Sequence, residues 1–221
     1  MSRHLLPVST ALIVCALSGP ALAEVTAKGE LGASFASGNS ETESANAALE
    51  LGLTSGKWAH TLGLAGNYGS DNDVTTAQRW EVRGQSGYDL TNRTYWFGAG
   101  RYEDDRFSAY DFQATASTGL GYKFIDSERT KLWVQGGPGY RFAEFNQTGE
   151  SEDSAIFRGD LGFDHQLTET TKIVERFLVE TGSDNTYLQN DLGLEVTIKG
   201  SLALRLGYQV RHNSDVPPGV D

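Results

Sequence analysis

The sequence has little cysteine, proline or methionine: of 221 residues, one is cysteine, five are proline and one is methionine. The single cysteine, Cys15, lies in an apolar N-terminal segment, so the rest of the chain has no disulfide framework. Basic residues are also scarce, 18 against 29 acidic ones, which excludes nucleic-acid binding driven by bulk charge. Beyond the N-terminal segment, no stretch approaches the ~18 consecutive apolar residues of a membrane-spanning helix.

The N-terminal segment has the organisation of a secretory signal peptide. Two basic positions precede an apolar run, residues 5–17, and residues 21–23 (Ala-Leu-Ala) follow as an A-x-A cleavage pattern. We therefore expect residues 1–23 to be removed on export. The mature chain, residues 24–221, then has 221 − 23 = 198 residues and no cysteine.

The mature chain is rich in glycine and in period-two alternation. From Phe112 to Phe124 every second residue is aromatic, aliphatic or Thr, whereas the residues between them are small or polar. After a short polar turn the alternation resumes over residues 131–142. Both segments are about ten residues long with aromatic ends, as in tilted strands that cross a bilayer. Strands of soluble sandwiches usually stop at about five or six residues.

Eleven such segments follow one another. We predict strands at 25–36, 45–55, 58–68, 79–89, 94–104, 112–124, 131–142, 155–165, 172–180, 187–198 and 201–211. Short turns alternate with longer polar loops between them, for example a loop over residues 69–78, which is the asymmetry of outer-membrane barrels. The predicted fold class is therefore all-β, a transmembrane up-and-down antiparallel β-barrel. Pro138, flanked by glycines, predicts a bulge or local bend within its strand, and a strand that is broken there is the alternative.

An odd strand count is unusual, because single-chain bacterial barrels have an even number of strands. We expect a barrel of about twelve strands with 11 present, the last being lost by C-terminal truncation. The expected domains are the signal peptide, residues 1–23, and an outer-membrane barrel over residues 24–221. A barrel that ends on an unpaired strand is the alternative.

Charged residues of both signs fall on the small, polar face of the predicted strands. Those that we assign to the lumen are Glu81, Arg83, Arg101, Glu103, Lys123, Arg141, Arg158, Asp160, Glu195 and Arg205. Such charges either pair across the interior as a plug or line a wet pore, and both interpretations stay open. The predicted external loops are acidic at Glu150, Glu152 and Asp153. These carboxylates would attract cations to the mouth, or are simply solvated loop residues.

Catalytic and metal-binding patterns are weak. His212, followed by Asp215, is the most enzyme-like pair, but no serine stands at a fixed spacing from it, and a histidine that packs at a strand end is the simpler interpretation. The mature chain has neither cysteine nor an HExxH motif, so we expect no metal and no cofactor. We therefore predict that the protein is not an enzyme.

Several segments resemble a known family. They are Ser-Gly-Asn-Ser at 37–40, Gly-Leu-Gly-Tyr at 119–122, Gly-Pro-Gly-Tyr-Arg at 137–141 and Arg-His-Asn-Ser-Asp-Val-Pro-Pro-Gly at 211–219. Over nearly the whole mature chain the sequence resembles the uncharacterised family of putative salt-induced outer membrane proteins. The resemblance implies a bacterial outer-membrane barrel in which a further strand follows the Pro-Pro-Gly loop. It supplies no established catalytic residues.

These patterns lead to one functional expectation and two alternatives. We expect a protein of the cell outer membrane, surrounded by its lipid, that acts as a small passive channel for ions or solutes, or as a structural envelope protein linked to salt or envelope stress. The alternatives are a rim-active hydrolase that uses His212, and a soluble periplasmic β-sandwich or lipocalin-like binder. No nucleic-acid partner is expected, and the sequence gives no oligomeric state.

Overall fold

The computed structural model describes residues 24–37, 41–108, 110–146, 148–183, 185–199 and 202–214. Its regular elements are strands: β1 (Glu24–Ser37), β2 (Glu41–Ser55), β3 (Trp58–Asp71), β4 (Val74–Asp89), β5 (Thr94–Asp105), β6 (Tyr110–Asp126), β7 (Thr130–Phe145), β8 (Ser151–Gln166), β9 (Thr171–Gly182), β10 (Thr186–Lys199) and β11 (Leu202–Asn213). The prediction of an all-β chain with eleven antiparallel strands is confirmed. The predicted signal peptide and the last seven residues lie outside the described residues. Within the described ranges, no helix is long and apolar enough to cross a membrane.

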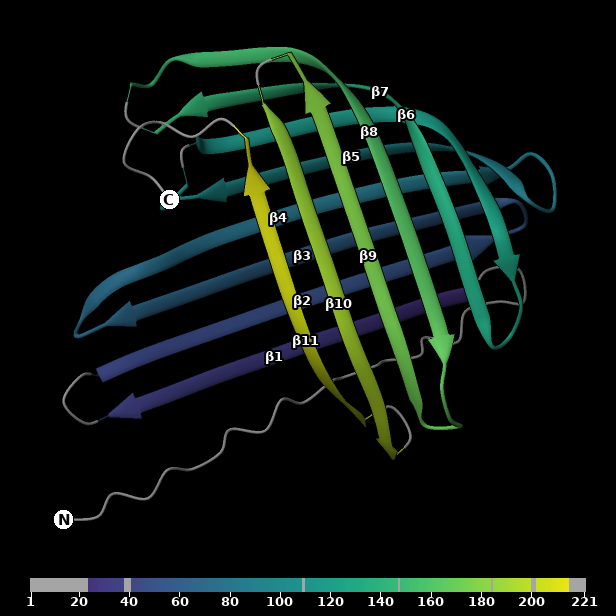
Figure 1. The fold of residues 1–221 in the computed structure, drawn as a ribbon, viewed down its shortest axis with the longest axis horizontal. Helices are drawn as coiled ribbons and strands as arrows, with labels where there is room; N and C mark the ends of the chain where they lie inside the picture. The colour runs from purple at the N-terminus through teal and green to yellow at the C-terminus, as the bar shows by residue number, and fades with distance from the viewer. Residues whose placement is uncertain are drawn as a thin grey trace.

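The strands form one sheet in sequence order. Each strand pairs antiparallel with the next, from β1 to β11. The sheet curls round on itself, so that β9, β10 and β11 pass in front of β2, β3 and β4 in Figure 1. The result is a curled half-barrel in which β1 and β11 are the two edges. We call the opening between these edges the seam.

The two ends of the half-barrel differ. At the turn end, short connections join the strands, and Gly56 supplies one of them with a φ of 60°. At the loop end, the strands run further than the sequence predicts. The predicted loop over residues 69–78 is wrong, because β3 and β4 continue to a two-residue turn in which Asn72 and Asp73 have φ values of 48° and 63°. The strand residues that extend the ladder at this end are mostly polar.

The sheet bends sharply within β6 and β7, where the curl passes from one wall to the other (Figure 1). The β6–β7 ladder breaks between the pairs Ser117–Gly139 and Leu120–Gly136. Pro138 lies inside this break, and it has no N–H to donate to a ladder. A Cβ on Gly119 or Gly137 would overlap backbone atoms of the opposite strand. Only glycine allows this approach, and the bend predicted at Pro138 is confirmed.

The two faces of the sheet have the reverse of the usual polarity. Large apolar side chains are exposed on the outer face, among them Leu120 at 56% and Phe124 at 55%. Thr115 and Ser117, which alternate with them, are buried inside. The buried polar and charged residues outnumber the buried apolar ones in the described part of the chain. The interior of the half-barrel is therefore the place to look for a functional site.

Candidate functional site

The centre of the interior is an ion-pair network on β4 and β5, which we call the central network. Period-two alternation turns Arg79 and Glu81 of β4, and Arg101 and Glu103 of β5, toward the inside. Arg79 donates hydrogen bonds to both Glu81 and Glu103, the latter at 2.9 Å. Arg101 donates to Glu103 at 2.7 Å. All four side chains are buried.

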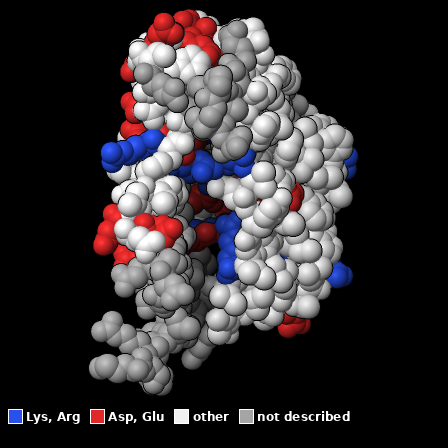
Figure 2. All heavy atoms as spheres, turned by 60° about the vertical axis from the view of Figure 1, so that its left-hand side comes forward, with Lys and Arg blue, Asp and Glu red and all other residues white. Residues whose placement is uncertain are grey.

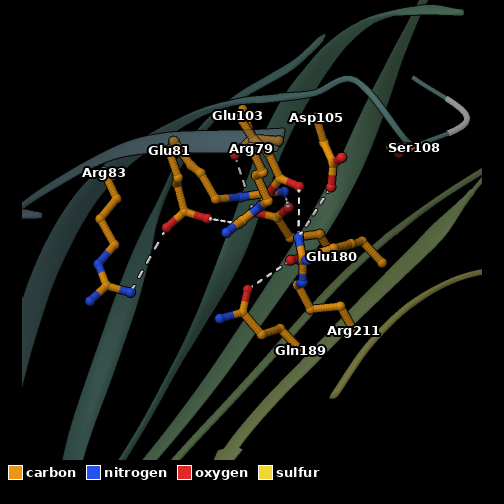
Figure 3. Close-up of polar contacts among 12 residues, drawn as sticks. Arg79, Glu81, Arg83, Glu103, Asp105, Ser108, Glu180, Gln189 and Arg211 are labelled. Carbon is orange, nitrogen blue, oxygen red and sulfur yellow. Dashed lines mark hydrogen bonds and ion pairs between the residues drawn. The ribbon is translucent and has the colours of Figure 1, made fainter. Parts of the chain in front are cut away.

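The central network also joins opposite walls of the half-barrel. Arg101 Nη2 on β5 lies 2.6 Å from Glu180 Oε2 on β9, and its guanidinium stacks 4.4 Å from the ring centroid of Tyr187 on β10. Arg211 Nη1 on β11 lies 3.3 Å from Glu103 Oε1 and 3.7 Å from Asp105 Oδ2 (Figure 3). These contacts link β5 directly to β9, β10 and β11. They cross the interior between the two walls of the half-barrel.

Glu180 is the most completely buried member, with no exposed side-chain surface. Besides Arg101, it accepts a hydrogen bond from Thr115 at 3.1 Å and one from Arg158 at 3.4 Å. Arg158 in turn makes a two-point contact with Asp160, at 2.8 Å from each of two nitrogens. Burying a carboxylate is costly unless it is paired and hydrogen-bonded, and here each buried charge has such partners.

A second polar layer lies on the turn side of the central network. The amides of Gln85 on β4 and Gln135 on β7 bond to each other at 2.9 and 3.2 Å. Tyr95 donates to Gln135 at 3.0 Å, and Gln135 donates to Asp160 at the same distance. Gly121 on β6 lies between Tyr95 and Gln135, and its missing side chain makes room for the Tyr95 ring.

A third cluster closes the loop end. Arg141 on β7 is fully buried, and it donates to Glu152 at 2.8 Å and to the Asn185 carbonyl oxygen at 3.3 Å. The Tyr110 hydroxyl adds a bond to Glu152 at 3.3 Å. Glu152 therefore belongs to β8 and to the interior, not to a solvated external loop as the sequence predicts. Among the described ion pairs, Glu152 is the only carboxylate that contacts Arg141.

The other two predicted external carboxylates differ from Glu152. Glu150 is exposed in the connection between β7 and β8. Asp153 lies in β8 and accepts a hydrogen bond from the exposed Tyr140 hydroxyl on β7. Because adjacent strand residues point to opposite faces, Glu152 and Asp153 lie on different sides of the sheet.

The remaining predicted lumen charges form pairs toward the turn end. Lys123 contacts Asp89 at 2.9 Å, Glu195 contacts Lys172 at 2.7 Å, and Arg205 contacts Glu30 at 2.8 Å. Arg83 contacts Glu50 at 3.3 Å, with both side chains substantially exposed at 52% and 39%. Figure 2, which brings the loop end forward, shows basic side chains in a hollow of the face that it presents, with acidic ones beside them. The charged pairs toward the turn end are more exposed than those of the central network.

Sequence analysis missed several members of the interior, namely Arg79, Tyr95, Gln135, Glu180 and Tyr187. Glu180 was obscured because its strand also turns apolar residues inward, including the buried Val174. Tyr95 was obscured because Trp96 and Phe97 beside it are aromatic as well. The alternation around Glu180 and Tyr95 would reveal their inward positions only if the inward faces of the neighbouring strands were already known.

The histidines show no catalytic arrangement within the described residues. His60 bonds to Ser86 at 2.9 Å and stacks on Trp58, while His165 bonds to Thr130 at 2.8 Å. None of these contacts includes a carboxylate. His212 lies in β11 opposite Leu188, and Asp215 is outside the described residues. Among the described side chains, no group of three or more His, Cys, Asp or Glu could hold a metal ion.

Comparisons with known proteins place the chain in a family. The family model described as "Protein of unknown function, DUF481" matches residues 29–221. The chain is also similar to "Uncharacterized protein YdiY" of Escherichia coli (strain K12), with 26% identity over 205 residues that cover 91% of this chain and 80% of the relative. No solved structure matches it significantly. The expectation of an uncharacterised family is thus confirmed, and the chain belongs to the DUF481 family of proteins of unknown function.

Proposed function

We propose that this protein is a β-barrel of the bacterial outer membrane that serves as a structural envelope protein, with an interior closed by ion pairs. The reversed polarity of the sheet supports a membrane location. Outward-facing leucines such as Leu62, Leu120 and Leu204 would contact lipid, whereas in water they would form a large apolar surface. In hydrocarbon, the ladders satisfy the backbone groups of β2 to β10 on both sides, whereas β1 and β11 are each paired on one side within the described residues.

Two aromatic belts on the outer face support the same location. At the turn end, the Trp58 ring lies 4.9 Å from Tyr88 and 6.4 Å from Trp96. Toward the loop end, the Tyr102 ring lies 5.0 Å from Trp80 and 5.8 Å from Phe112. Aromatic residues form such girdles at both membrane interfaces of outer-membrane barrels.

The two belts lie at different levels of the outer face. Trp80 and Tyr88 are eight residues apart on β4, and Trp96 and Tyr102 are six residues apart on β5, which corresponds to about 20 to 26 Å along a strand.

The contact between Arg101 and Glu180 is the observation that carries the structural role. It joins β5 to β9 at 2.6 Å in the middle of the interior, and both side chains are almost fully buried. A wet pore at this level would leave these groups exposed to water. A closed interior therefore favours a structural barrel over a passive pore.

A small passive channel is the second candidate function. It is favoured by Lys28, Glu50 and Arg83, which leave charged and partly exposed surface at the turn end of the interior. In such a channel, the central network would be the constriction that has to open before ions pass.

Membrane fractionation and bilayer recordings test the proposal and separate the two candidates. The full chain should fractionate with outer membranes and show heat-modifiable mobility in gels, and the refolded protein should give no steady conductance in a planar bilayer. A steady conductance of the unmodified protein would replace the structural role with the channel. Recovery in the soluble periplasmic fraction would overturn the membrane location itself.

A further inference from the structure

One acidic residue of β9 lies on the apolar outer face of the sheet. Val174 and Glu180 of this strand are buried on the inner face, so period-two alternation turns Glu175 outward. Its outward neighbours along the strand, Ile173 and Phe177, are both apolar. Among the outward positions of the described strands, Glu175 is the only acidic or basic residue with an apolar neighbour on each side along its strand.

Apolar residues also face Glu175 from both adjacent strands. In the ladders it lies opposite Phe163 on β8 and Leu192 on β10. Leu192 is 44% exposed and Phe177 is 38% exposed, so this part of the outer face is open. A carboxyl group among such side chains is costly in a membrane, because hydrocarbon offers it no hydrogen-bond partner.

Glu175 has one polar neighbour on this face. The side-chain amide of Asn190 on β10 donates a hydrogen bond from Nδ2 to Glu175 Oε1. Asn190 itself lies opposite Phe177 on β9 and Val210 on β11, so it is also surrounded by apolar residues. We call Glu175 and Asn190 the outer polar pair.

The outer polar pair has hydrogen-bonding capacity to spare. Within the described residues, the side chain of Glu175 makes no hydrogen bond other than that from Asn190, and it makes no ion pair. A carboxyl group offers about four hydrogen-bonding positions, and an Asn amide has two N–H donors and a carbonyl oxygen that can accept. One hydrogen bond between the two leaves donors and acceptors for a further partner.

The outer polar pair is complementary to itself. A second copy of the chain offers the same amide and the same carboxyl group, so Asn190 of each copy can donate to Glu175 of the other. Reciprocal contacts of this kind are those of a two-fold interface, in which one patch serves both subunits. Two copies inserted in the same direction are related by an axis along the membrane normal, which places their polar pairs at the same depth. A lipid acyl chain offers neither group.

We propose that the outer face of β9 and β10 around the outer polar pair binds a second copy of this chain in the membrane. This inference rests on the proposed membrane location. Amide–carboxyl hydrogen bonds are exchanged at the centre of the contact, and Phe177 and Leu192 pack around them. Side-chain hydrogen bonds of this kind join membrane-spanning helices, and the surrounding hydrocarbon is the same for strands.

Fluorescence energy transfer between labelled chains in lipid vesicles tests the proposal. The full 221-residue chain carries Cys15→Ser and Glu169→Cys, which places one label in the exposed turn between β8 and β9. Donor-labelled and acceptor-labelled chains are mixed, and transfer is followed as the ratio of protein to lipid is lowered. We expect transfer that disappears on dilution in lipid. With Glu175→Leu or Asn190→Leu, half-association should require a ratio about tenfold higher.

Three further variants separate the polar contact from an effect on folding. Leucine suits a lipid-facing position, so Glu175→Leu and Asn190→Leu should keep the heat-modifiable folded band. Glu175→Gln retains a donor and an acceptor, and it should associate at about the same ratio as the unmodified chain. Leu62→Ala is the matched control, because Leu62 is 45% exposed on the opposite wall, on β3, and it should leave the ratio unchanged.

Four results would overturn the proposal. No transfer at any ratio, from chains that have inserted into the vesicles, would show a monomer and leave the membrane location intact. Half-association of Glu175→Leu at the unmodified ratio would show that the copies meet at another face. An effect of Glu175→Gln as large as that of Glu175→Leu would exclude the exchange of hydrogen bonds. Chains that do not insert would overturn the membrane location, and this inference with it.

Discussion

Arg101 Nη2 on β5 and Glu180 Oε2 on β9 lie 2.6 Å apart across the interior, although 79 residues separate them in the sequence. Thr115 and Arg158 also bond to Glu180, so one carboxylate ties together β5, β6, β8 and β9. The curl of the sheet and the pairing of its buried charges therefore depend on each other.

Replacing this carboxylate should destabilise the protein strongly. Glu180→Gln keeps the shape of the side chain but removes the negative charge of one carboxylate beside the buried Arg101. Loss of one partner of a buried ion pair typically costs about 3–5 kcal/mol. Urea unfolding of the protein in micelles, followed by tryptophan fluorescence, measures the change in the free energy of unfolding.

Lys28→Ala is the matched control for Glu180→Gln. Lys28 lies 4.0 Å from Glu50, and both side chains are substantially exposed. An exposed pair contributes at most about 1 kcal/mol, so this variant should unfold close to the unmodified protein. Equal effects of the two substitutions would show that the central network does not stabilise the fold.

The bend in β6 and β7 should not tolerate a single added methyl group. In Gly137→Ala, the new Cβ would overlap the Thr118 carbonyl oxygen and the Gly119 Cα of the facing strand. The bend would open, and the walls that carry Arg101 and Glu180 would separate. We expect Gly137→Ala to lose most of the heat-modifiable folded band in gels.

Gly100→Ala tests whether that loss is specific to the bend. The nearest atom to a Cβ at Gly100 is the Thr115 carbonyl oxygen, at 3.7 Å, which is an ordinary contact. The variant should fold to the same extent as the unmodified protein. A Gly137→Ala protein that folds equally well would mean that the sheet can curl without this close approach.

Sequence alternation predicts the eleven strands and most of their faces because a period of two is a direct consequence of strand geometry. It places Leu120 outside and Thr115 inside, as the structure does. It fails on β9, where Val174 and Glu180 share the buried inner face and no division into apolar and polar sides exists. It also fails at the loop end, where polar residues on both sides of β3 and β4 look like a loop.

The pairing of the interior charges could not be predicted from the sequence. The ten lumen candidates give the chemistry of the interior, but which arginine meets which carboxylate depends on how far the sheet curls. That curl is determined at Gly119 and Gly137, where backbone meets backbone. Arg101 and Glu180 become neighbours only after the bend brings β9 across from β5.

Two neighbouring carboxylates at the loop end should respond differently to neutralisation. Glu152→Gln leaves the fully buried Arg141 without its carboxylate partner, so the free energy of unfolding should fall by about 3 kcal/mol. Glu150 is exposed, and Glu150→Gln should change the free energy of unfolding by less than about 0.5 kcal/mol. Urea unfolding of both variants measures the difference, and similar values for the two would contradict the interior position of Glu152.

The aromatic belts predict the depth of each tryptophan in a membrane. Trp58 and Trp96 lie in the belt at the turn end, Trp80 lies in the opposite belt, and all three are exposed on the outer face. Trp133 is the internal control, because its ring lies over Gly162, which is buried on the inner face. Variants that keep one tryptophan each, with phenylalanine at the other positions, allow the four to be compared in the same lipid.

In vesicles made with brominated lipids, the three outer tryptophans should be quenched most by bromine near the headgroups, since interfacial aromatic rings lie at that level. Trp133 should be quenched least at every depth, because the wall of the half-barrel separates it from lipid. Equal quenching of Trp133 and Trp80 would contradict the assignment of the two faces. Strongest quenching of Trp58 or Trp80 by bromine at the bilayer centre would contradict the belts, and with them the placement of this sheet across a membrane.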